Sequence, residues 1–369
     1  MSHLSQSALS RRDFLALTGA SVAAAAFPQT ASAQAQLPAA ELTSLTLKQA
    51  SDLIKSKKVT SLDLTRACLD RIDKYEPVLN AFITVTAEKA LAQAREMDAE
   101  TAKGKRRGPL HGIPIALKDN IDTAGIRTTA ASLLFAERIP IEDAEVLRKL
   151  KSAGAVILGK LNMAIFAGST LSTYYKPAIN PWAPDRTTAG SSTGSAVAVI
   201  SEMCFGALGT DTRGSIRGPA GVCGLVGLKP TYGRVSNRGV IPYIWSLDTV
   251  GPMTRTVEDA AIMLQAIAGY DVADPSTVNQ PVPDYVSGMK RAVKSLRIGT
   301  PSVPYFNDLS EEFRPAVHEA LNVVNKLTAS SQDVTNSPDL WTRRHAERRD
   351  LRISFAMVPE IQGRLSCDL

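Results

Sequence analysis

The 369-residue sequence contains few of the side chains from which metal sites and disulfide frameworks are built. Its four histidines form no H-E-x-x-H motif and its four cysteines form no C-x-x-C motif, so the sequence gives no support to a metal site. Four cysteines in so long a chain also do not make a disulfide framework. Three of the cysteines lie among apolar neighbours, as small core residues do: Cys68, Cys204 and Cys223.

Long apolar runs are also missing. No stretch approaches the roughly 18 apolar residues that a membrane span needs, so we expect no stable membrane insertion. The weak apolar run at residues 14–27 follows Arg11-Arg12 and precedes an A-x-A cleavage site at residues 31–33, an order typical of a twin-arginine export signal. We therefore predict a signal peptide at residues 1–33, the twin-arginine export machinery as a partner, and a periplasmic or secreted protein. The alternative is a tail that carries two arginines by chance.

Neither sign of charge dominates the sequence. The net charge of +6 arises from 42 basic and 36 acidic residues that are scattered along the chain. One compact basic run, residues 103–107, is accompanied by glycines and indicates a surface turn. No aromatic residues alternate with its charges to stack on bases, so we expect no nucleic-acid partner. The hydrophobic share of 44% and the charged share of 21% are those of a globular protein.

Helical and strand-like segments alternate through the middle of the chain. After possible N-caps at Thr60 and Ser61, a helical pattern places four apolar residues on one face: Leu64, Cys68, Leu69 and Ile72. An alanine-rich helix is expected at residues 87–103. A further helix ends at Gly154 and leads into a buried strand at residues 155–158.

A capping box from Thr256 to Asp259 opens another predicted helix. Its apolar residues share one face: Val257, Ala260, Ala261, Leu264 and Ile267. Strands and helices in alternation indicate an α/β fold with a mostly buried sheet.

Two serine-containing loops carry the candidate chemistry. The first, "TTAGSSTGSAVAV" at residues 187–199, formally matches the G-x-S-x-G elbow that exposes a nucleophilic serine, here Ser192, at a sheet edge. That elbow requires a buried strand running into the turn, but residues 180–189 contain two prolines and several polar residues, as loops do. An α/β-hydrolase esterase that uses Ser192 is therefore a distant alternative.

The second loop follows an apolar strand that begins at Cys204 and breaks at Gly209, and it places Ser215 in a glycine-flanked turn. Its backbone N–H groups are expected to converge on a developing oxyanion: Thr212, Arg213, Gly214 and Ser215. Lys118 ends the apolar run "IPIALK", where burial lowers the pKa of an amine and makes its neutral form available as a base. Taken singly, Ser215 is explained more simply as a turn residue and Lys118 as the charged end of a strand.

Taken together, these segments resemble the amidase signature family over residues 43–328. The resemblance runs through "LHGIPIALKDN", "AGSSTGSAVAV", "GTDTRGSIRGPAGVCGLVGLKPTYGRVSNRGVIP" and "SLDTVGPMTRTVEDAA". It implies an α/β fold with a mixed β-sheet sandwiched between α-helices. It also implies a Ser-cisSer-Lys triad that hydrolyses linear amides without a cofactor.

The resemblance further implies which residues form the site. Ser191 and Ser215 are 24 positions apart, the interval between the two serines of the family's triad. Lys118 is then the base, Ser191 is the bridging serine that follows a cis peptide bond, and Ser215 is the nucleophile that forms an acyl-enzyme. Ser192 and Asp211 are expected to support these loops.

Arg213 stands where the family usually has glycine. Glycine adopts positive φ without a side-chain penalty, and arginine does not. Two expectations follow and stay open at this point: a distorted oxyanion hole, or an Arg213 side chain that reaches into the pocket and favours a substrate with a carboxylate.

The chain ends well short of typical family members, and from residue 329 it becomes rich in arginine and irregular in its apolar spacing. We therefore predict an incomplete amidase signature domain at residues 34–328, with its C-terminal part missing. It is followed by an atypical tail at residues 329–369, which a frame shift would explain. A sheet without its last strands exposes an edge and an apolar face, so we expect poor stability.

These observations favour an exported amidase that hydrolyses a small-molecule carboxamide to a carboxylate and ammonia or an amine. A second interpretation is a truncated, non-catalytic relic or partner-binding protein with the same fold. A role like that of the glutaminase subunit of tRNA amidotransferases is disfavoured by the export signal. The particular amide and the oligomeric state stay open.

Overall fold

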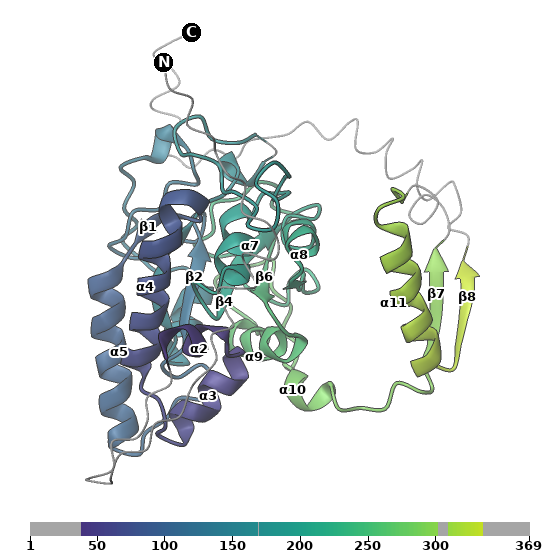
Figure 1. The fold of residues 1–369 in the computed structure, drawn as a ribbon, viewed down its shortest axis with the longest axis horizontal. Helices are drawn as coiled ribbons and strands as arrows, with labels where there is room; N and C mark the ends of the chain where they lie inside the picture. Colours follow the sequence, from purple (N-terminus) through teal and green to yellow (C-terminus); the bar gives the residue numbers. More distant parts are fainter. Residues whose placement is uncertain (1–37, 169, 302–308, 335–369) are drawn as a thin grey trace, which may run out of the picture. The chain divides into compact units, whose positions relative to one another are not determined.

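The computed structural model describes residues 38–168, 170–301 and 309–334, and it divides the chain into two compact units, residues 1–286 and 287–369 (Figure 1). The predicted signal peptide and all but the first residues of the predicted C-terminal tail lie outside the described residues. The sequence predicts one domain that runs to residue 328, whereas the structure divides after Val286.

The first unit contains helices and strands in alternation, as the sequence predicts. Its helices are α2 (Ala39–Ser44), α3 (Leu47–Lys55), α4 (Ser61–Leu79), α5 (Ala87–Ala102), α6 (Glu145–Ser152), α7 (Thr193–Ile200), α8 (Arg217–Cys223) and α9 (Val257–Ile267), with 3-10 turns η1 (Leu133–Phe135) and η2 (Ile165–Ala167). Its strands are β1 (Phe82–Val85), β2 (Pro114–Lys118), β3 (Val156–Leu161), β4 (Gly206–Asp211), β5 (Val226–Gly227) and β6 (Thr249–Thr254). The short helix α10 (Tyr285–Gly288) crosses the division between the units.

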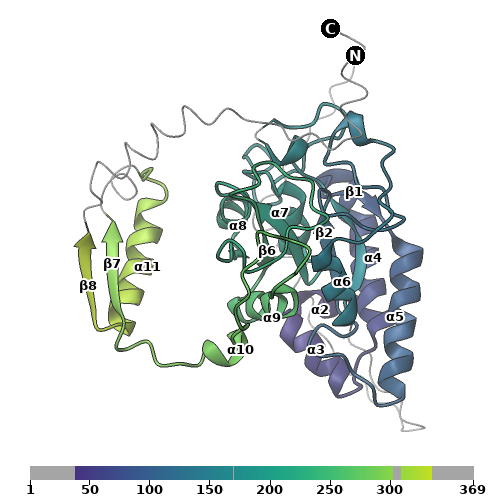
Figure 2. The same cartoon turned by 180° about the vertical axis from the view of Figure 1, so that it is seen from behind.

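These strands form one mixed sheet in the order β1-β3-β2-β4-β6-β5. β2 pairs in parallel with β3 and β4, and the remaining pairs are antiparallel. α7 packs against β2, β3, β4 and β6 and lies over the sheet in Figure 1, whereas α6 comes into view from behind in Figure 2. The predicted α/β fold with a mixed sheet between helices is confirmed. Because β3, β2 and β4 are parallel, their carboxyl ends meet at one edge of the sheet.

The first long helix, α4, begins where the sequence predicts. The Thr60 side chain accepts the Asp63 N–H while the Asp63 carboxylate accepts the Thr60 N–H, so a complete capping box starts the helix. The four apolar residues predicted to share one face are all buried. The next helix, α5, ends at Ala102, just before Gly104 with φ +73°.

The start of α9 differs from the prediction. Thr256 Oγ1 accepts the Asp259 N–H at 3.1 Å, as expected. The Asp259 carboxylate, however, accepts from the backbone N–H groups of Leu47 and Lys48 at the start of α3. The predicted capping box is therefore only half formed, because a tertiary contact uses its carboxylate. Val257, predicted on the apolar face, is exposed, while the other four apolar residues of that face are buried.

The strand before the second serine loop is longer than predicted. β4 does not break at Gly209 but continues to Asp211 and pairs with β6 along its whole length. Gly209 serves another purpose, because a Cβ atom built there would lie 2.8 Å from Ser192 Oγ. The missing side chain allows the segment at the start of α7 to approach the strand closely.

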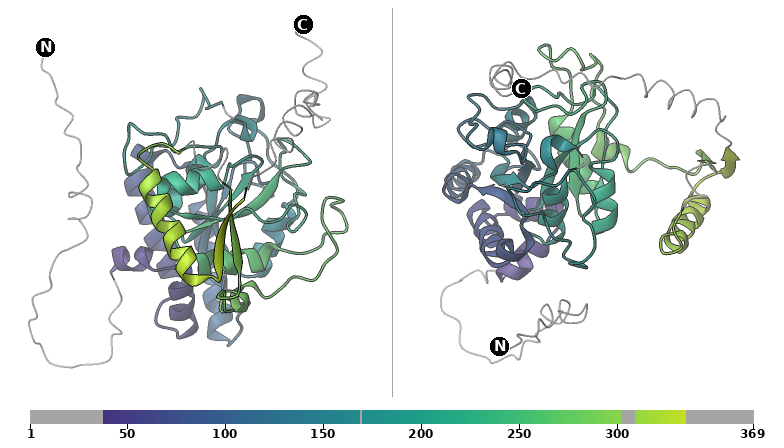
Figure 3. Two further views of the ribbon diagram at one scale, coloured as in Figure 1. Left: turned by 90° about the vertical axis from the view of Figure 1, so that its right-hand side faces the viewer. Right: turned by 90° about the horizontal axis from the view of Figure 1, so that it is seen from above.

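The described part of the second unit is small. It contains β7 (Arg297–Pro301), α11 (Arg314–Leu327) and β8 (Ser330–Val334). β7 and β8 pair in parallel as a separate two-stranded sheet, and α11 lies beside it (Figures 1 and 3).

Candidate active site

Lys118 is the last residue of β2 and is fully buried. Its Nζ atom donates to Ser191 Oγ at 2.8 Å, to Thr210 Oγ1 at 2.8 Å and to the Thr210 carbonyl oxygen at 3.4 Å. Burial lowers the pKa of Lys118 to about 7, although the negative charges of Asp248 and Asp211 oppose the shift. The expected lowering of this pKa is confirmed, and the neutral amine is available near neutral pH.

Ser191 lies in the loop before α7, and the peptide bond between Gly190 and Ser191 is cis, as the resemblance implies. Its side chain is buried against Lys118. The Ser191 carbonyl oxygen accepts the Ala164 N–H at 3.0 Å, which ties this loop to the segment that follows β3. The fold thus brings together a lysine and a serine that are 73 positions apart in the sequence.

Ser192 occupies the N-cap position of α7 and is wholly buried. Its hydroxyl accepts the Thr210 N–H and donates to the Thr210 carbonyl oxygen, both at 3.3 Å. The described residues between η2 and α7 form a loop and not a strand. The structure therefore lacks the strand-to-helix elbow that the esterase alternative requires, and Ser192 instead connects α7 to β4.

Ser215 lies between β4 and α8 and is half-buried. Its carbonyl oxygen accepts the Ser192 N–H at 3.2 Å, which holds the two serine loops side by side. Its hydroxyl makes no hydrogen bond to any residue that the structure describes. Ser215 is therefore placed next to the Ser191-Ser192 segment with an uncommitted hydroxyl.

Asp211, at the end of β4, organises the turn that carries Ser215. Its carboxylate accepts the N–H groups of Gly214 at 2.7 Å and Ile216 at 3.1 Å, and it pairs with Arg217 Nε at 3.0 Å. Burial alone would raise the pKa of Asp211, but the hydrogen bonds from Arg217 and from the backbone outweigh it and hold that pKa below its usual value. The carboxylate is thus ionised and fixes the turn.

One of the four predicted oxyanion-hole donors already donates a hydrogen bond within the protein. The Gly214 N–H donates to Asp211 Oδ1, so its inclusion in the oxyanion hole is corrected by this structure. The N–H groups of Thr212, Arg213 and Ser215 have no acceptor among the described residues. Three donors of this turn therefore remain for a developing negative charge.

Arg213 is not in the left-handed conformation that glycine readily adopts. Its φ lies outside the positive region, and the positive φ here belongs to Gly214, at 132°. The expectation of a distorted oxyanion hole therefore stays a prediction. The Arg213 side chain is exposed.

Sequence reasoning missed two polar neighbours of Lys118. Thr210 accepts from Lys118 Nζ, and its Oγ1 also accepts from Asn120 Nδ2 at 3.2 Å. Asn120 is anchored in turn because its Nδ2 donates to the Ile241 carbonyl oxygen at 3.3 Å. Both residues stand in quoted motifs, but only the pairing of β2 with β4 shows that they meet.

Sequence reasoning also missed Asp248, which directly precedes β6 and contacts the turn that carries Ser215. Its Oδ1 accepts from Thr212 Oγ1 at 2.5 Å, and its Oδ2 accepts the N–H groups of Tyr243 and Ile244. Burial raises the pKa of Asp248 in spite of these donors. This carboxylate ties the first residue of the turn to the segment before β6.

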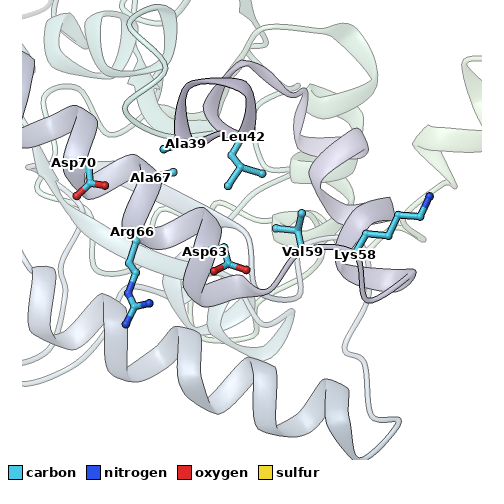
Figure 4. A pocket seen from close by; sticks show the side chains of 8 residues that line it. All are labelled: Ala39, Leu42, Lys58, Val59, Asp63, Arg66, Ala67 and Asp70. Carbon is cyan, nitrogen blue, oxygen red and sulfur yellow. The ribbon is translucent and has the colours of Figure 1, made fainter. Parts of the chain in front are cut away.

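One pocket in the described residues lies away from these site residues. It has a volume of about 210 Å³ on α2 and α4, where Figure 4 shows Leu42 and Val59 together with charged side chains such as Lys58 and Arg66. None of the site residues lines it. The described residues also contain no group of His, Cys, Asp or Glu side chains that could hold a metal ion, and no helix with the length and apolar character of a bilayer span.

The fold and a match to a family model define the class of protein. Residues 63–340 match the model of the family described as Amidase, and the chain belongs to this family.

Individual relatives agree with that assignment. The chain is 47% identical over 297 residues to the A subunit of glutamyl-tRNA(Gln) amidotransferase from Geobacter sp. (strain M21), an alignment that covers 80% of this chain and 61% of the relative. Among solved structures, it is similar to the native peptide amidase from Stenotrophomonas maltophilia, with 38% identity, a TM-score of 0.75, and coverage of 83% of this chain and 64% of that one. The corresponding glutamyl-tRNA(Gln) amidotransferase subunit from Thermotoga maritima gives 34% identity, a TM-score of 0.70, and coverage of 88% and 70%. The chain thus spans about 61% of the length of the curated relatives it matches.

Proposed function

We propose that this protein hydrolyses a carboxamide through an acyl-enzyme, with Lys118, Ser191 and Ser215 as the catalytic residues. The observation that carries the proposal is the 2.8 Å hydrogen bond between the buried Lys118 amine and Ser191 Oγ, beside a serine with an uncommitted hydroxyl. A lysine with a pKa of about 7 is a suitable general base near neutral pH.

In the proposed reaction, Ser215 Oγ attacks the amide carbonyl carbon while its proton passes to Ser191 Oγ and the Ser191 proton passes to Lys118 Nζ. The carbonyl oxygen becomes an oxyanion beside the N–H groups of Thr212, Arg213 and Ser215. The proton then returns along the same path to the leaving nitrogen, and the C–N bond breaks. Water, deprotonated by the same route, releases the carboxylate and restores the Ser215 hydroxyl.

A serine-directed fluorophosphonate tests this assignment directly. We expect the probe to label the Ser215 peptide of the full chain, and labelling to disappear in Ser215→Ala. Ser192→Ala is the matched control and should still be labelled, because its hydroxyl is bonded to Thr210. Labelling at Ser192, or a chain that hydrolyses no member of a panel of aliphatic, aryl and amino-acid amides, would contradict the proposal and favour the non-catalytic interpretation.

A second candidate function is that of one component of an amidotransferase. Its support is the 47% identity to the Geobacter amidotransferase protein. This candidate predicts that L-glutamine is the preferred amide and that turnover rises in the presence of partner proteins. Equal turnover with and without such partners would favour an independent amidase.

We also propose that the protein is exported. The support is the order of Arg11-Arg12, the apolar run at residues 14–27 and the A-x-A site at residues 31–33. Fractionation of expressing cells should find the protein outside the cytoplasm, cleaved after Ala33. Replacing both arginines by lysine should retain it inside, and unchanged export of that variant would contradict a twin-arginine route.

A further inference from the structure

Arg213 is an exposed arginine without a partner in the part of the chain that the structure describes. It forms neither an ion pair nor a side-chain hydrogen bond with a described residue. It lies in the short turn between β4 and α8, two positions before Ser215. Its charge is therefore available to a ligand at the proposed reaction site.

The two carboxylates that hold this turn do not neutralise Arg213. Asp211 accepts from Arg217 and from the backbone N–H groups of Gly214 and Ile216. Asp248 accepts from the Thr212 hydroxyl and from two backbone N–H groups of the segment before β6. Both oxygens of each carboxylate are thus engaged by other donors, and the turn keeps one uncompensated cation.

The chain geometry keeps this cation close to the reacting atoms. Two residues span at most about 7 Å between Cα atoms, and an arginine side chain is long and flexible. A substrate whose carbonyl carbon contacts Ser215 Oγ and whose carbonyl oxygen contacts the turn N–H groups therefore lies within the range of the Arg213 guanidinium. That planar group presents paired N–H donors that match the two oxygens of a carboxylate.

We propose that Arg213 binds a carboxylate of the substrate, so that the preferred substrates are amides that carry a carboxylate a few bonds from the scissile carbonyl. This inference rests on the proposed amidase function. It selects among amides and does not alter the chemistry at Ser215. Because the side chain is exposed, the preference should weaken as ionic strength rises.

The test compares matched substrates in the full-length protein. Succinamate and glutaramate carry a carboxylate on the acyl side, butyramide and valeramide are neutral partners, and N-acetylglycine carries a carboxylate on the amine side. We expect kcat/KM for at least one carboxylate substrate to exceed that for its neutral partner by about tenfold or more, as charge-assisted hydrogen bonds allow. Arg213→Gln should reduce this ratio about tenfold, and Arg213→Lys should restore part of it.

Arg95→Gln is the matched control. Arg95 is also an exposed arginine that pairs with no described residue, and it lies on α5, away from the serine loops in the sequence. The ratio should be unchanged in this variant. An equal ratio in wild type and Arg213→Gln, with neutral amides still hydrolysed, would overturn the role of Arg213 and leave the amidase function standing.

A binding measurement keeps the inference testable if turnover is absent. Calorimetry with succinamate and glutaramate on Ser215→Ala should show an affinity about tenfold higher than on Ser215→Ala/Arg213→Gln. Equal affinities, or no binding to either protein, would overturn the proposal about Arg213. Failure of every amide to turn over, with the carboxylate still bound through Arg213, would instead count against the proposed hydrolysis.

Discussion

Two buried lysines lie at or next to the last residue of neighbouring strands, in different surroundings. Lys118 ends β2, and Lys160 is the penultimate residue of β3; both are fully buried. In the parallel register Leu117 pairs with Lys160, so the two lysine side chains point to opposite faces of the sheet. Lys118 meets hydroxyl groups, whereas Lys160 lies 3.5 Å from the Asp119 carboxylate.

The groups that contact each lysine explain why Lys118 is a candidate base and why Lys160 has a structural role. Lys160 Nζ donates to the Ile121 carbonyl oxygen and to Thr128 Oγ1, both at 2.7 Å, and the adjacent carboxylate favours its charged form. Burial lowers the pKa of Lys160 to about 8, in opposition to Asp119. Lys118 has no carboxylate in contact among the described residues, and burial lowers its pKa to about 7. Contact with a serine hydroxyl, more than burial itself, therefore distinguishes the candidate base.

The largest expected effect separates the two lysines by activity. Lys118→Ala should lower kcat/KM for amides by about a thousandfold or more, because it removes the general base. The measurement is steady-state hydrolysis, with thermal unfolding to show that the variant is folded. If a folded Lys118→Ala kept most of its rate while Lys160→Ala lost it, the assignment of the two lysines would be reversed.

The next effect separates them by stability. Lys160→Met should lower the free energy of unfolding by about 3 to 5 kcal/mol, because it leaves the Asp119 carboxyl buried without its cation. Urea denaturation measures this change. The double variant Lys160→Met/Asp119→Asn should recover part of the loss, since asparagine still accepts from Thr129 and carries no charge. No recovery in the double variant would show that the pair is not the source of the effect.

The third effect is the pH dependence of catalysis. The neutral form of Lys118 is the base, so kcat/KM should rise about tenfold per pH unit below pH 7 and level off above a midpoint of about 7. His111→Gln should keep this midpoint, because the His111 ring contacts the Met97 carbonyl oxygen and Thr101 Oγ1 and none of the site residues. A midpoint near 10 would show that Lys118 is not perturbed in solution.

The smallest effect distinguishes the adjacent serines. Ser192→Ala should lower kcat/KM by less than about tenfold, because it loses two long hydrogen bonds to the Thr210 backbone. Ser191→Ala should cost much more, since it interrupts the proposed path from Ser215 to Lys118. Similar losses in the two variants would contradict the relay.

The sequence predicts the fold and the burial of Lys118 well, for identifiable physical reasons. Periodic apolar residues and the Thr60 cap are local signals, and α4 begins where they predict. The apolar run that ends at Lys118 predicts a buried amine, and the structure confirms it. The family resemblance links Lys118 to Ser191 before any contact is known, and the two are hydrogen-bonded.

What the sequence does not predict depends on contacts between distant segments. The local pattern assigns Asp259 to its own helix cap, but its carboxylate binds the start of α3. Gly209 resembles a strand break and is instead a point of close approach to Ser192. No local sequence pattern predicts an acceptor for the Gly214 N–H, yet this group donates a hydrogen bond to the Asp211 side chain. Side-chain to backbone contacts of this kind leave no periodic pattern.

Thr210 gives the Lys118 site a direction. A neutral amine has two hydrogens and one lone pair, and the Thr210 carbonyl oxygen can only accept a hydrogen. Asn120 already donates to Thr210 Oγ1, which favours that oxygen as an acceptor for the second amine hydrogen. In the neutral amine the lone pair then faces Ser191 Oγ, whose hydroxyl has a proton to give up. Thr210 therefore restricts the rotation of the Lys118 amine, so that its lone pair points toward Ser191 Oγ before a substrate binds.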